Sequence, residues 1–518
     1  MFEKIIKKHD EPFDHTDELI SDLGLHNLLY SKDLNLAEFI SVDEDVIRER
    51  NHVIHDLVSV PELHTVFLSV IDDLRYIKNM VNIREAHYAS ETHLYSVKQL
   101  DIYFHCIDSI VQNGEHFNKA DSYSIRDFYS DVVKISESNE YKKLREGTKE
   151  LLKRIGSVKS ISLGFNFNED LSLKDGGILS INTTPIVSKT LIERLLSVQD
   201  TNALHSMAPL TTPKILNRHE SSLMNDTIYT ALNKVFKKNL SQWQPTIDAF
   251  LSNSCKELLN SLPVLVFLTE SVRIHRIMTE LRLPLCKPTI YPTYEKVFSV
   301  KKAYNPVTAL QIGAAKIVKN DITFDEKGQF YILTGPNQGG KSVFLRSIGI
   351  IQVFAQLGWL VPAESASISP VTGLYTHFPK NVSENGSGMG RLEEECHRLS
   401  AIVEKLSQFS MLLLDETLSS TNAYEATYIA CDFIRGVTDM GCRGIFSTHL
   451  HEVVEVTERH NAQANSHSVI DYLKVGIEHD KRTYKVYRAK SDGKSYAHDI
   501  AKRYGLTYDQ IKSTVSDS

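Results

Sequence analysis

The chain has 518 residues, too many for one hydrophobic core, so we expect roughly two to four domains. Apolar residues make up 42% and charged residues 24%, the balance of an ordinary globular protein. The net charge of -7 excludes a basic surface over the whole chain, so contact with DNA would depend on local basic patches.

The cysteines and the hydropathy of the sequence indicate the cellular compartment to expect. The six cysteines show no paired CxxC spacing, so we interpret them as buried thiols in a reducing environment. The N-terminus carries no apolar stretch of signal-peptide length, and no run of about 18 apolar residues occurs anywhere. We therefore expect a cytoplasmic protein without a membrane partner.

From Phe13 to about Gly156 the periodicity is mainly helical. One apolar stripe consists of Leu57, Val60, Leu63, Val66, Phe67, Val70, Ile71 and Leu74. A second helix is marked by Leu94, Val97, Leu100, Ile102 and Phe104. The charged stretch 141–154 is more typical of a solvated helix face than of a DNA contact.

The middle of the chain changes character twice. Alternating residues and turn formers predict a small β-insertion near 157–184. A long helical pattern follows from Ser221 to about Leu283, with breaks expected at Pro245 and Pro263. Prolines 284, 288 and 292 mark a domain boundary, and the strands and helices that alternate after it predict an α/β layer with a parallel sheet.

The segment 331–345 contains the pattern G-x-x-x-x-G-K-[ST] between a strand-like and a helical run. Such a loop turns its backbone N–H groups toward phosphate oxygens at a helix N-terminus. We expect Lys341 to meet the β- and γ-phosphates and Ser342 to bind Mg²⁺. The alternative is a plain glycine turn. The nucleotide-contacting residues predicted here are Gly335, Pro336, Asn337, Gln338, Gly339, Gly340, Lys341, Ser342 and Val343.

Two further strand ends carry polar residues. Asp415 and Glu416 follow the apolar run 411–414, and we expect Asp415 to hold Mg²⁺ and Glu416 to polarise the attacking water. Alone, this pair would be an ordinary strand end. The strand 444–447 leads to His449, placed to contact the γ-phosphate, although a histidine there is often only a polar cap.

With these residues in place, the sequence resembles the MutS family of DNA mismatch repair ATPases. The motifs TGPNQGGKS, LLLDE, STHLHE and FAQLGWLVPA follow that family's ATPase domain from about Asn305 to Val454. The stretch 43–63 resembles the start of its helical core and lever region, and 493–511 its C-terminal dimerisation segment. The resemblance implies a homodimeric ATPase that uses ATP and Mg²⁺ and clamps DNA, in repair or recombination.

The fold class expected is an α/β P-loop ATPase domain of the ABC/MutS type, preceded by a mainly α-helical core and lever domain with a small β-insertion. We expect an N-terminal segment 1–40, the helical domain 41–290, the ATPase domain 291–480 and a dimerisation segment 481–518. Because the core-like pattern starts near residue 40, we expect a short family member without mismatch-reading and connector domains. Phe167-Asn168-Glu169 spells the family's mismatch wedge, but its place in the β-insertion favours coincidence.

Three departures from the family pattern matter. In the family, a Ser-Thr-Phe loop completes the partner's ATP site; Gly390 and Arg391 stand where Ser and Thr would fall, so we expect Arg391 to act on the partner's nucleotide. The usual glycine-and-arginine turn after Glu416 is TLSST here, which puts communication between the sites in question. Ile317 stands where the family stacks an aromatic residue on adenine.

Two other functional classes stay open. The first is an ATP-switched scaffold that grips protein and does not bind DNA, which the net acidity favours. The second is a soluble transporter-type ATPase subunit, which leaves the helical residues before the ATPase unexplained. Salt-dependent DNA binding separates the MutS-type reading from the scaffold, because phosphate contacts release counterions.

Overall fold

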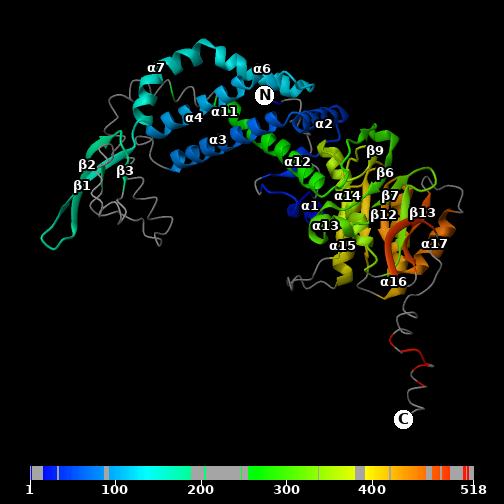
Figure 1. Cartoon of the computed structure of the whole chain (residues 1–518). Helices are drawn as coiled ribbons and strands as arrows, with labels where there is room; N and C mark the ends of the chain where they lie inside the picture. The colour runs from blue at the N-terminus through cyan, green and yellow to red at the C-terminus, as the bar shows by residue number, and fades with distance from the viewer. Residues whose placement is uncertain are drawn as a thin grey trace. The chain divides into compact units, whose positions relative to one another are not determined.

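A computed structural model describes residue 2 and the ranges 16–31, 34–86, 93–187, 255–336, 338–379, 391–418, 422–461, 469–478 and 481–489, together with 204–205, 247 and isolated positions from 504 to 512 (Figure 1). The chain divides into two compact units. One comprises residues 1–2 and 60–265, and the other comprises residues 3–59 and 266–518. This division differs from the expected boundaries at 40 and 290, since most of the N-terminal segment groups with the C-terminal half.

The unit formed by 60–265 is mainly helical. Its main helices are α3 (Pro61–Ala86), α4 (His93–Gln112), α5 (Gly114–Phe117), α6 (Tyr123–Glu137), α7 (Asn139–Gly156) and α11 (Lys256–Asn260). Helix α4 contacts α3, α6 and α7, and the core between them contains a cluster of Phe67, Phe117 and Phe128 rings. All three side chains are buried, and Phe67 lies on the first apolar stripe that the periodicity predicts.

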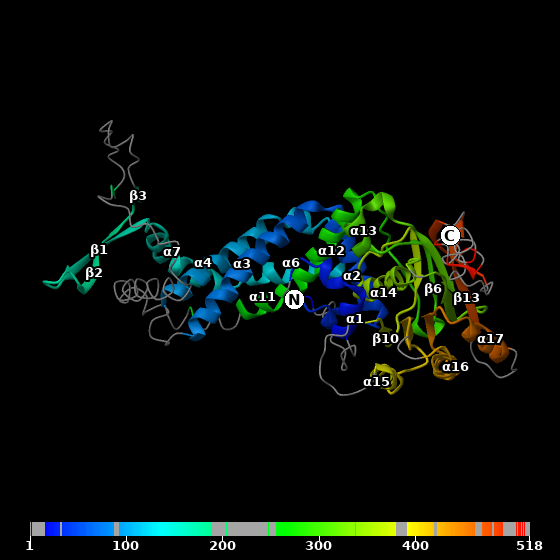
Figure 2. The same cartoon turned by 90° about the horizontal axis from the view of Figure 1, so that it is seen from below.

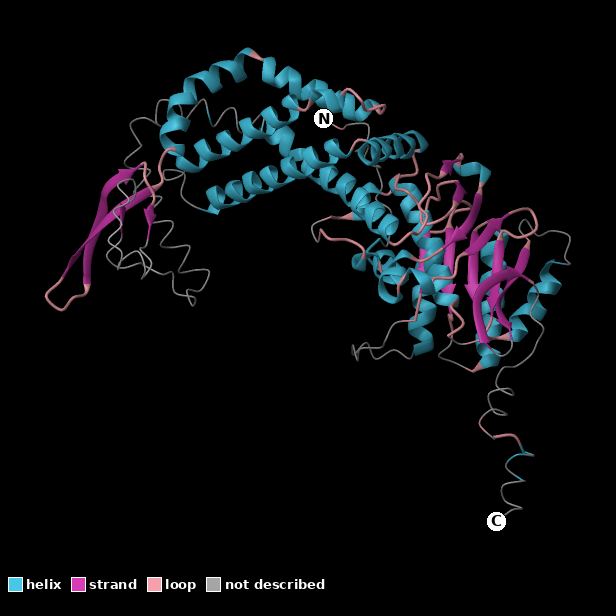
Figure 3. Cartoon of the chain, in the orientation of Figure 1, coloured by secondary structure: helices cyan, strands magenta, loops and turns pink. Residues whose placement is uncertain are grey.

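A β-hairpin follows α7 in the stretch where the β-insertion is expected (Figure 3). Strands β1 (Ser160–Phe167) and β2 (Leu173–Asn182) pair antiparallel, and β3 (Ile186–Val187) pairs in parallel with β4 (Leu204–His205). The helical pattern expected from Ser221 lies outside the described residues until Cys255, apart from Ile247.

The helical pattern breaks beside Pro263, as the sequence predicts, because α11 ends at Asn260 and a new helix begins at Leu262. Pro263 is the second residue of this helix, α12 (Leu262–Glu280). A proline in the first helical turn costs little, because the N–H that it lacks would have no intrahelical acceptor there. The proline therefore marks where α12 begins.

The second unit is built around a six-stranded sheet with the order β10-β11-β12-β8-β13-β14. The first five strands run parallel and β14 pairs antiparallel with β13. The strands are β8 (Phe330–Thr334), β10 (Leu374–His377), β11 (Met411–Asp415), β12 (Arg443–Ser447), β13 (Ile470–Glu478) and β14 (Lys481–Arg488). Strand β14 lies in the stretch expected for dimerisation, and here it extends the sheet.

Helices cover both faces of this sheet, as its nearly continuous apolar strands require (Figure 2). These helices are α14 (Lys341–Leu357), α15 (Arg391–Val403), α16 (Ala423–Asp439) and α17 (His451–Asn461), and the unit also contains α13 (Pro306–Ile312). Leu412 and Leu414 pack with α15, α16 and α17, while Leu413 faces α14 at Gly349. A smaller sheet, with the order β5-β9-β6-β7, consists of β5 (Thr289–Ile290), β9 (Ser365–Ile368), β6 (Phe298–Ala303) and β7 (Asn320–Phe324).

The N-terminal segment joins this unit through α1 (Thr16–Leu23) and α2 (Glu44–Ser59). The fully buried Arg50 guanidinium lies over the rings of Phe39 and Phe267, which stack 4.2 Å apart. The Gln356 amide of α14 donates to the Ser41 carbonyl at 3.0 Å. Burial lowers the pKa of Arg50 to about 9. Such contacts explain why residues before 60 belong to the α/β unit.

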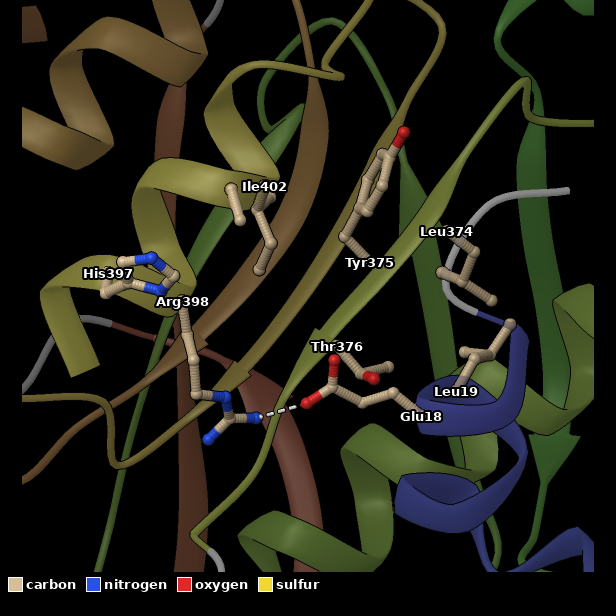
Figure 4. Close-up of a pocket in the computed structure, with 9 residues that line it drawn as sticks. Glu18, Leu19, Leu374, Tyr375, Thr376, His397, Arg398 and Ile402 are labelled. Atoms are coloured by element: carbon tan, nitrogen blue, oxygen red, sulfur yellow. Dashed lines mark hydrogen bonds and ion pairs between the residues drawn. The ribbon is translucent and has the colours of Figure 1, made fainter. Parts of the chain in front are cut away.

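Helix α1 has its own set of anchors at the edge of the main sheet (Figure 4). Glu18 forms an ion pair of 2.8 Å with Arg398 of α15. The Asp22 carboxylate accepts from Thr376 of β10, and its carbonyl accepts from Arg346 of α14, both at 2.8 Å. Helix α1 therefore connects β10, α14 and α15.

All six cysteines fall within the described residues and are free thiols. Among the described residues, no single helix combines the length and the apolar character needed to cross a membrane. The bent pair Glu44–Ser59 and Pro61–Asn79 meets that test only when its two helices are taken together.

Candidate functional site

The carboxyl ends of three parallel strands meet at one edge of the main sheet. Strand β12 lies between β8 and β11, and Ser447 is in register with both Leu333 and Asp415. The backbone continues this alignment, because Thr448 N–H donates to Leu333 O and Glu416 N–H donates to Ser447 O. The segments that follow β8, β11 and β12 therefore lie side by side, at the edge where open α/β sheets bind ligands.

The glycine-rich loop joins β8 to the N-terminus of α14. Gly335 has φ 154°, and a Cβ there would lie 2.8 Å from Cβ of Val475. Gly340, the residue before α14, has φ 93° in the left-handed region. These two glycines permit the turn, because a side chain would clash at the first and be strained at the second. Asn337 lies outside the described residues.

Lys341, the first residue of α14, is buried beneath this loop. Its side chain is 3% exposed. The ammonium donates to the carbonyls of Gly335 and Pro336 at 3.1 and 3.4 Å. Nζ also lies 3.3 Å from Oε1 of Glu416. The Lys341 ammonium and the Glu416 carboxylate thus meet from the segments that follow β8 and β11, the two strands on either side of β12.

Asp415 is the buried last residue of β11. Burial raises the pKa of its carboxyl group, while the nearby hydroxyls of Ser342 and Ser447 oppose that shift. Oδ1 is inaccessible to solvent and accepts no hydrogen bond from the described residues. A buried carboxylate oxygen without a donor is costly for folding alone. The Asp415 carboxylate is therefore well suited to bind a cation, and the Ser342 hydroxyl beside it supplies a second oxygen ligand.

The turn after Asp415 is strained. Glu416 and Leu418 have φ 46° and 65°, a region that costs a non-glycine residue about 1–2 kcal/mol. Leu418 is only 1% exposed, so its side chain packs in the core despite this conformation. Between them, Thr417 Oγ1 lies 3.1 Å from Nδ1 of His377, the last residue of β10. The surrounding contacts hold the turn that aims Glu416.

Two predicted site residues are less closely tied to this arrangement. His449 follows β12 and is exposed, and it does not line the pocket that the described residues form. Arg391 is the first described residue after the gap at 380–390 and begins α15, and the loop before it lies outside the described residues. The position of Arg391 relative to a partner's nucleotide therefore stays a prediction.

A pocket of about 640 Å³ opens beside the glycine-rich loop. The loop and Glu416 line it together with α13 and residues of the segment 316–320. That volume is within the range of small-molecule sites. Its wall includes Val343 and Ile317, both singled out by the sequence, with Gln338, Gly339, Gly340, Lys341 and Ser342.

Tyr484 of β14 also lines this pocket, and sequence reasoning missed it. A Cβ on Gly340 would lie 3.2 Å from Cδ1 of the Tyr484 ring, so the ring lies directly against the loop. Asn320 holds the strand in place by donating to Tyr484 O at 3.1 Å and accepting from Val486 N–H at 2.8 Å. The only sequence signal was an aromatic residue in a late strand.

The arrangement can bind an anion and a cation together. The loop and the helix N-terminus favour negative groups, the Lys341 ammonium adds positive charge, and Asp415 with Ser342 offers oxygen ligands. A parallel sheet whose strand leads through a glycine-rich loop into a helix defines an α/β domain with the architecture typical of phosphate-binding proteins.

Comparison with known proteins identifies the family. Residues 331–515 match the family model described as MutS domain V. The chain is 34% identical over 233 residues to the DNA mismatch repair protein MutS of Chlorobium chlorochromatii, which covers 43% of this chain and 25% of that protein. It is 31% identical over 217 residues to MutS of Prochlorococcus marinus, covering 41% and 23%. These matches identify residues 331–515 as a domain of the MutS family.

A eukaryotic relative gives a similar match. The DNA mismatch repair protein MSH2 of Saccharomyces cerevisiae is 29% identical over 202 residues, covering 38% of this chain and 21% of that protein. In each case the matched part spans about a quarter or less of the relative's length.

Proposed function

We propose that the α/β unit binds ATP with Mg²⁺ and hydrolyses it, and that hydrolysis controls DNA binding in a mismatch-repair type of process. One observation carries this proposal: the buried Lys341 ammonium lies 3.3 Å from the Glu416 carboxylate, and both residues line a pocket large enough for a nucleotide. The MutS relatives support it, since their names assign them to DNA mismatch repair.

Different groups of the chain bind the phosphates and orient the attacking water. Backbone N–H groups from Gly335 to Gly340 and the Lys341 ammonium bind and orient the phosphates. Glu416 accepts a hydrogen bond from the attacking water and orients it for in-line attack. His449 is assigned to the γ-phosphate from the next strand end.

The residues present fit a magnesium ion. The buried Oδ1 of Asp415, which accepts no hydrogen bond within the described part of the chain, and the neighbouring Ser342 hydroxyl are oxygen ligands of the kind that Mg²⁺ prefers. When bound, the metal neutralises charge on the phosphate oxygens. Asp415 would hold it through its carboxylate or an intervening water, and Ser342 would hold it directly.

The test of the chemistry compares two variants that fail at different steps. Glu416→Gln should retain ATP binding, because glutamine keeps the shape, but lower kcat by about 10²–10⁴-fold through loss of the carboxylate. Lys341→Ala should weaken nucleotide binding itself. Glu452→Gln, on the exposed side of α17, serves as the matched control. A wild-type turnover rate in Glu416→Gln would show that the carboxylate has another role.

DNA binding and assembly are further parts of the proposal. We infer a homodimer formed through the ATPase units, with the helical unit acting as core and lever. Fluorescence anisotropy with duplex, mismatched and branched DNA, with and without ATP, measures the coupling. Affinity that falls steeply with salt is expected, because each neutralised phosphate releases counterions. Flat salt dependence or no ATP effect would contradict a DNA clamp.

A second function, an ATP-switched scaffold for a protein partner, is favoured by the composition of the hairpin. Strand β1 exposes Leu163, Phe165 and Phe167 on one side, with 36%, 47% and 57% of their surface accessible. Apolar side chains suit protein better than a phosphate backbone. The DNA experiment separates the two functions, since a scaffold would show no salt-dependent DNA affinity.

A further inference from the structure

We propose that His377 is a positioning residue for ATP hydrolysis: through its hydrogen bond to Thr417 it fixes the turn that aims the Glu416 carboxylate. This inference rests on the proposed ATPase function. It concerns what fixes the conformation of the turn that follows β11. Neither the nucleotide-contacting loop nor the metal ligands explain that conformation.

The first step is the conformation of the turn. Residues 416 and 418 both adopt positive φ, although neither is glycine. Such conformations persist only where neighbouring groups hold them, and they gather at functional sites. Without an anchor at residue 417, the turn would relax toward ordinary backbone angles and carry the carboxylate with it.

The second step is the set of anchors. Ser447 O accepts from the Glu416 N–H at 2.9 Å, and the Leu418 side chain is buried in the core. Those contacts hold the two ends of the turn. The centre is held by Thr417 Oγ1, 3.1 Å from His377 Nδ1, with both residues buried at 3% and 2% exposure. This is the side-chain contact that reaches the turn from the neighbouring strand β10.

The third step is that His377 is itself well placed. Strand β10 pairs with β11, and His377 is in register with Leu414 just before the acidic pair. The preceding residue, Thr376, donates to the Asp22 carboxylate of α1 at 2.8 Å. A fixed strand end therefore presents the imidazole to Thr417, the residue next to Glu416.

The expected effect follows from geometry. Glu416 lies 3.3 Å from the Lys341 ammonium, so a small displacement changes where its carboxylate meets water. A misplacement of about 1 Å can cost 10²-fold in rate. We expect loss of the hydrogen bond to lower kcat at least 10-fold while the KM for ATP changes less than two-fold, because the phosphate-binding loop is left intact.

The experiment is steady-state ATPase kinetics on the full chain with four substitutions. Thr417→Val removes the hydroxyl and keeps the branched shape, whereas Thr417→Ser keeps the hydroxyl. His377→Ala removes the imidazole, and His377→Asn restores a polar group on the same side. Thr438→Val is the matched control, since Thr438 is equally buried but bonds only carbonyls of its own helix, at Ile434 and Arg435.

The expected pattern is a kcat loss in Thr417→Val and His377→Ala, recovery in Thr417→Ser and partial recovery in His377→Asn, with Thr438→Val unchanged. The double variant Thr417→Val/His377→Ala should be no slower than the slower single variant, because both remove one interaction. Thermal unfolding of each variant identifies any that fail to fold, and the serine and asparagine variants then decide the outcome.

Three results would overturn the inference. The first is unchanged kcat in Thr417→Val and His377→Ala, and the second is a rise in KM without loss of kcat. The third is additive losses in the double variant. If the wild-type protein hydrolyses ATP, any of these results refutes only the positioning role of His377. If the wild-type protein does not hydrolyse ATP, the proposed ATPase function is refuted as well.

Discussion

Replacing Tyr484 by alanine should weaken nucleotide binding without altering the chemistry at the phosphates. The tyrosine ring lies at the pocket wall against Gly340, and the same pocket is lined by the aliphatic Ile317. We therefore expect the tyrosine to supply the aromatic face on which the base packs.

The size of the effect follows from the exposure of the ring. Base–aromatic stacking is worth about 1–3 kcal/mol per base by alanine substitution. Because Tyr484 is 45% exposed, only about half of its surface is free to be covered by a ligand, which places the loss near 1–1.5 kcal/mol. This corresponds to about a 5- to 12-fold increase in the Kd for ATP.

Isothermal titration calorimetry with a slowly hydrolysed ATP analogue measures that change. Tyr484→Phe keeps the ring and should bind like the wild-type protein. Tyr487→Ala is the matched control, since Tyr487 lies on the same strand with a similar exposure of 47% but does not line the described pocket. Equal losses in Tyr484→Ala and Tyr487→Ala would refute the stacking role and point to a general effect on β14.

Two further predictions concern the partner subunit and pH. Mixing Arg391→Ala with Lys341→Ala protein should partly restore ATPase activity, because a mixed dimer has one intact site if Arg391 acts in trans; no recovery despite proven subunit exchange would count against that role. Burial raises the pKa of Asp415 above 3.8, so Mg²⁺ affinity, measured by titration, should fall with decreasing pH at a higher pH than for an exposed aspartate. Between 3.8 and the raised value the native state holds more protons than the unfolded state, so without metal the free energy of unfolding should decrease as pH rises through that window; Asp415→Asn should remove this slope in urea unfolding.

Local patterns were enough to predict the parallel α/β layer. The apolar runs 331–333 and 411–414 became the buried strands β8 and β11, because a strand covered by helices on both faces needs no polar alternation. The order of residues around Lys341 also placed the glycine-rich loop between a strand and a helix. Both features depend on neighbours within about 15 residues.

Contacts between residues far apart in the sequence could not be predicted from local patterns. Tyr484 reaches the pocket from a strand that pairs antiparallel at the sheet edge, more than 140 residues after Gly340. Arg50 would be expected on a helix surface from its charge, yet it is fully buried against the stacked rings of Phe39 and Phe267. The positive φ of Leu418 is equally invisible, since leucine gives no local reason to adopt it.

The anchoring of α1 has a consequence for how the chain is made. Asp22 and its partner Arg346 are 324 positions apart in the sequence. At a translation rate of about 5–20 residues per second, Arg346 is therefore synthesised roughly 15–65 seconds after Asp22. During that interval Leu19 and Leu23, which end up 1% and 0% exposed, have no native surface to cover them. The whole helical unit, 60–265, emerges in between and can fold first. Biosynthesis therefore favours an early state in which the amino-terminal helix is free for a chaperone to hold.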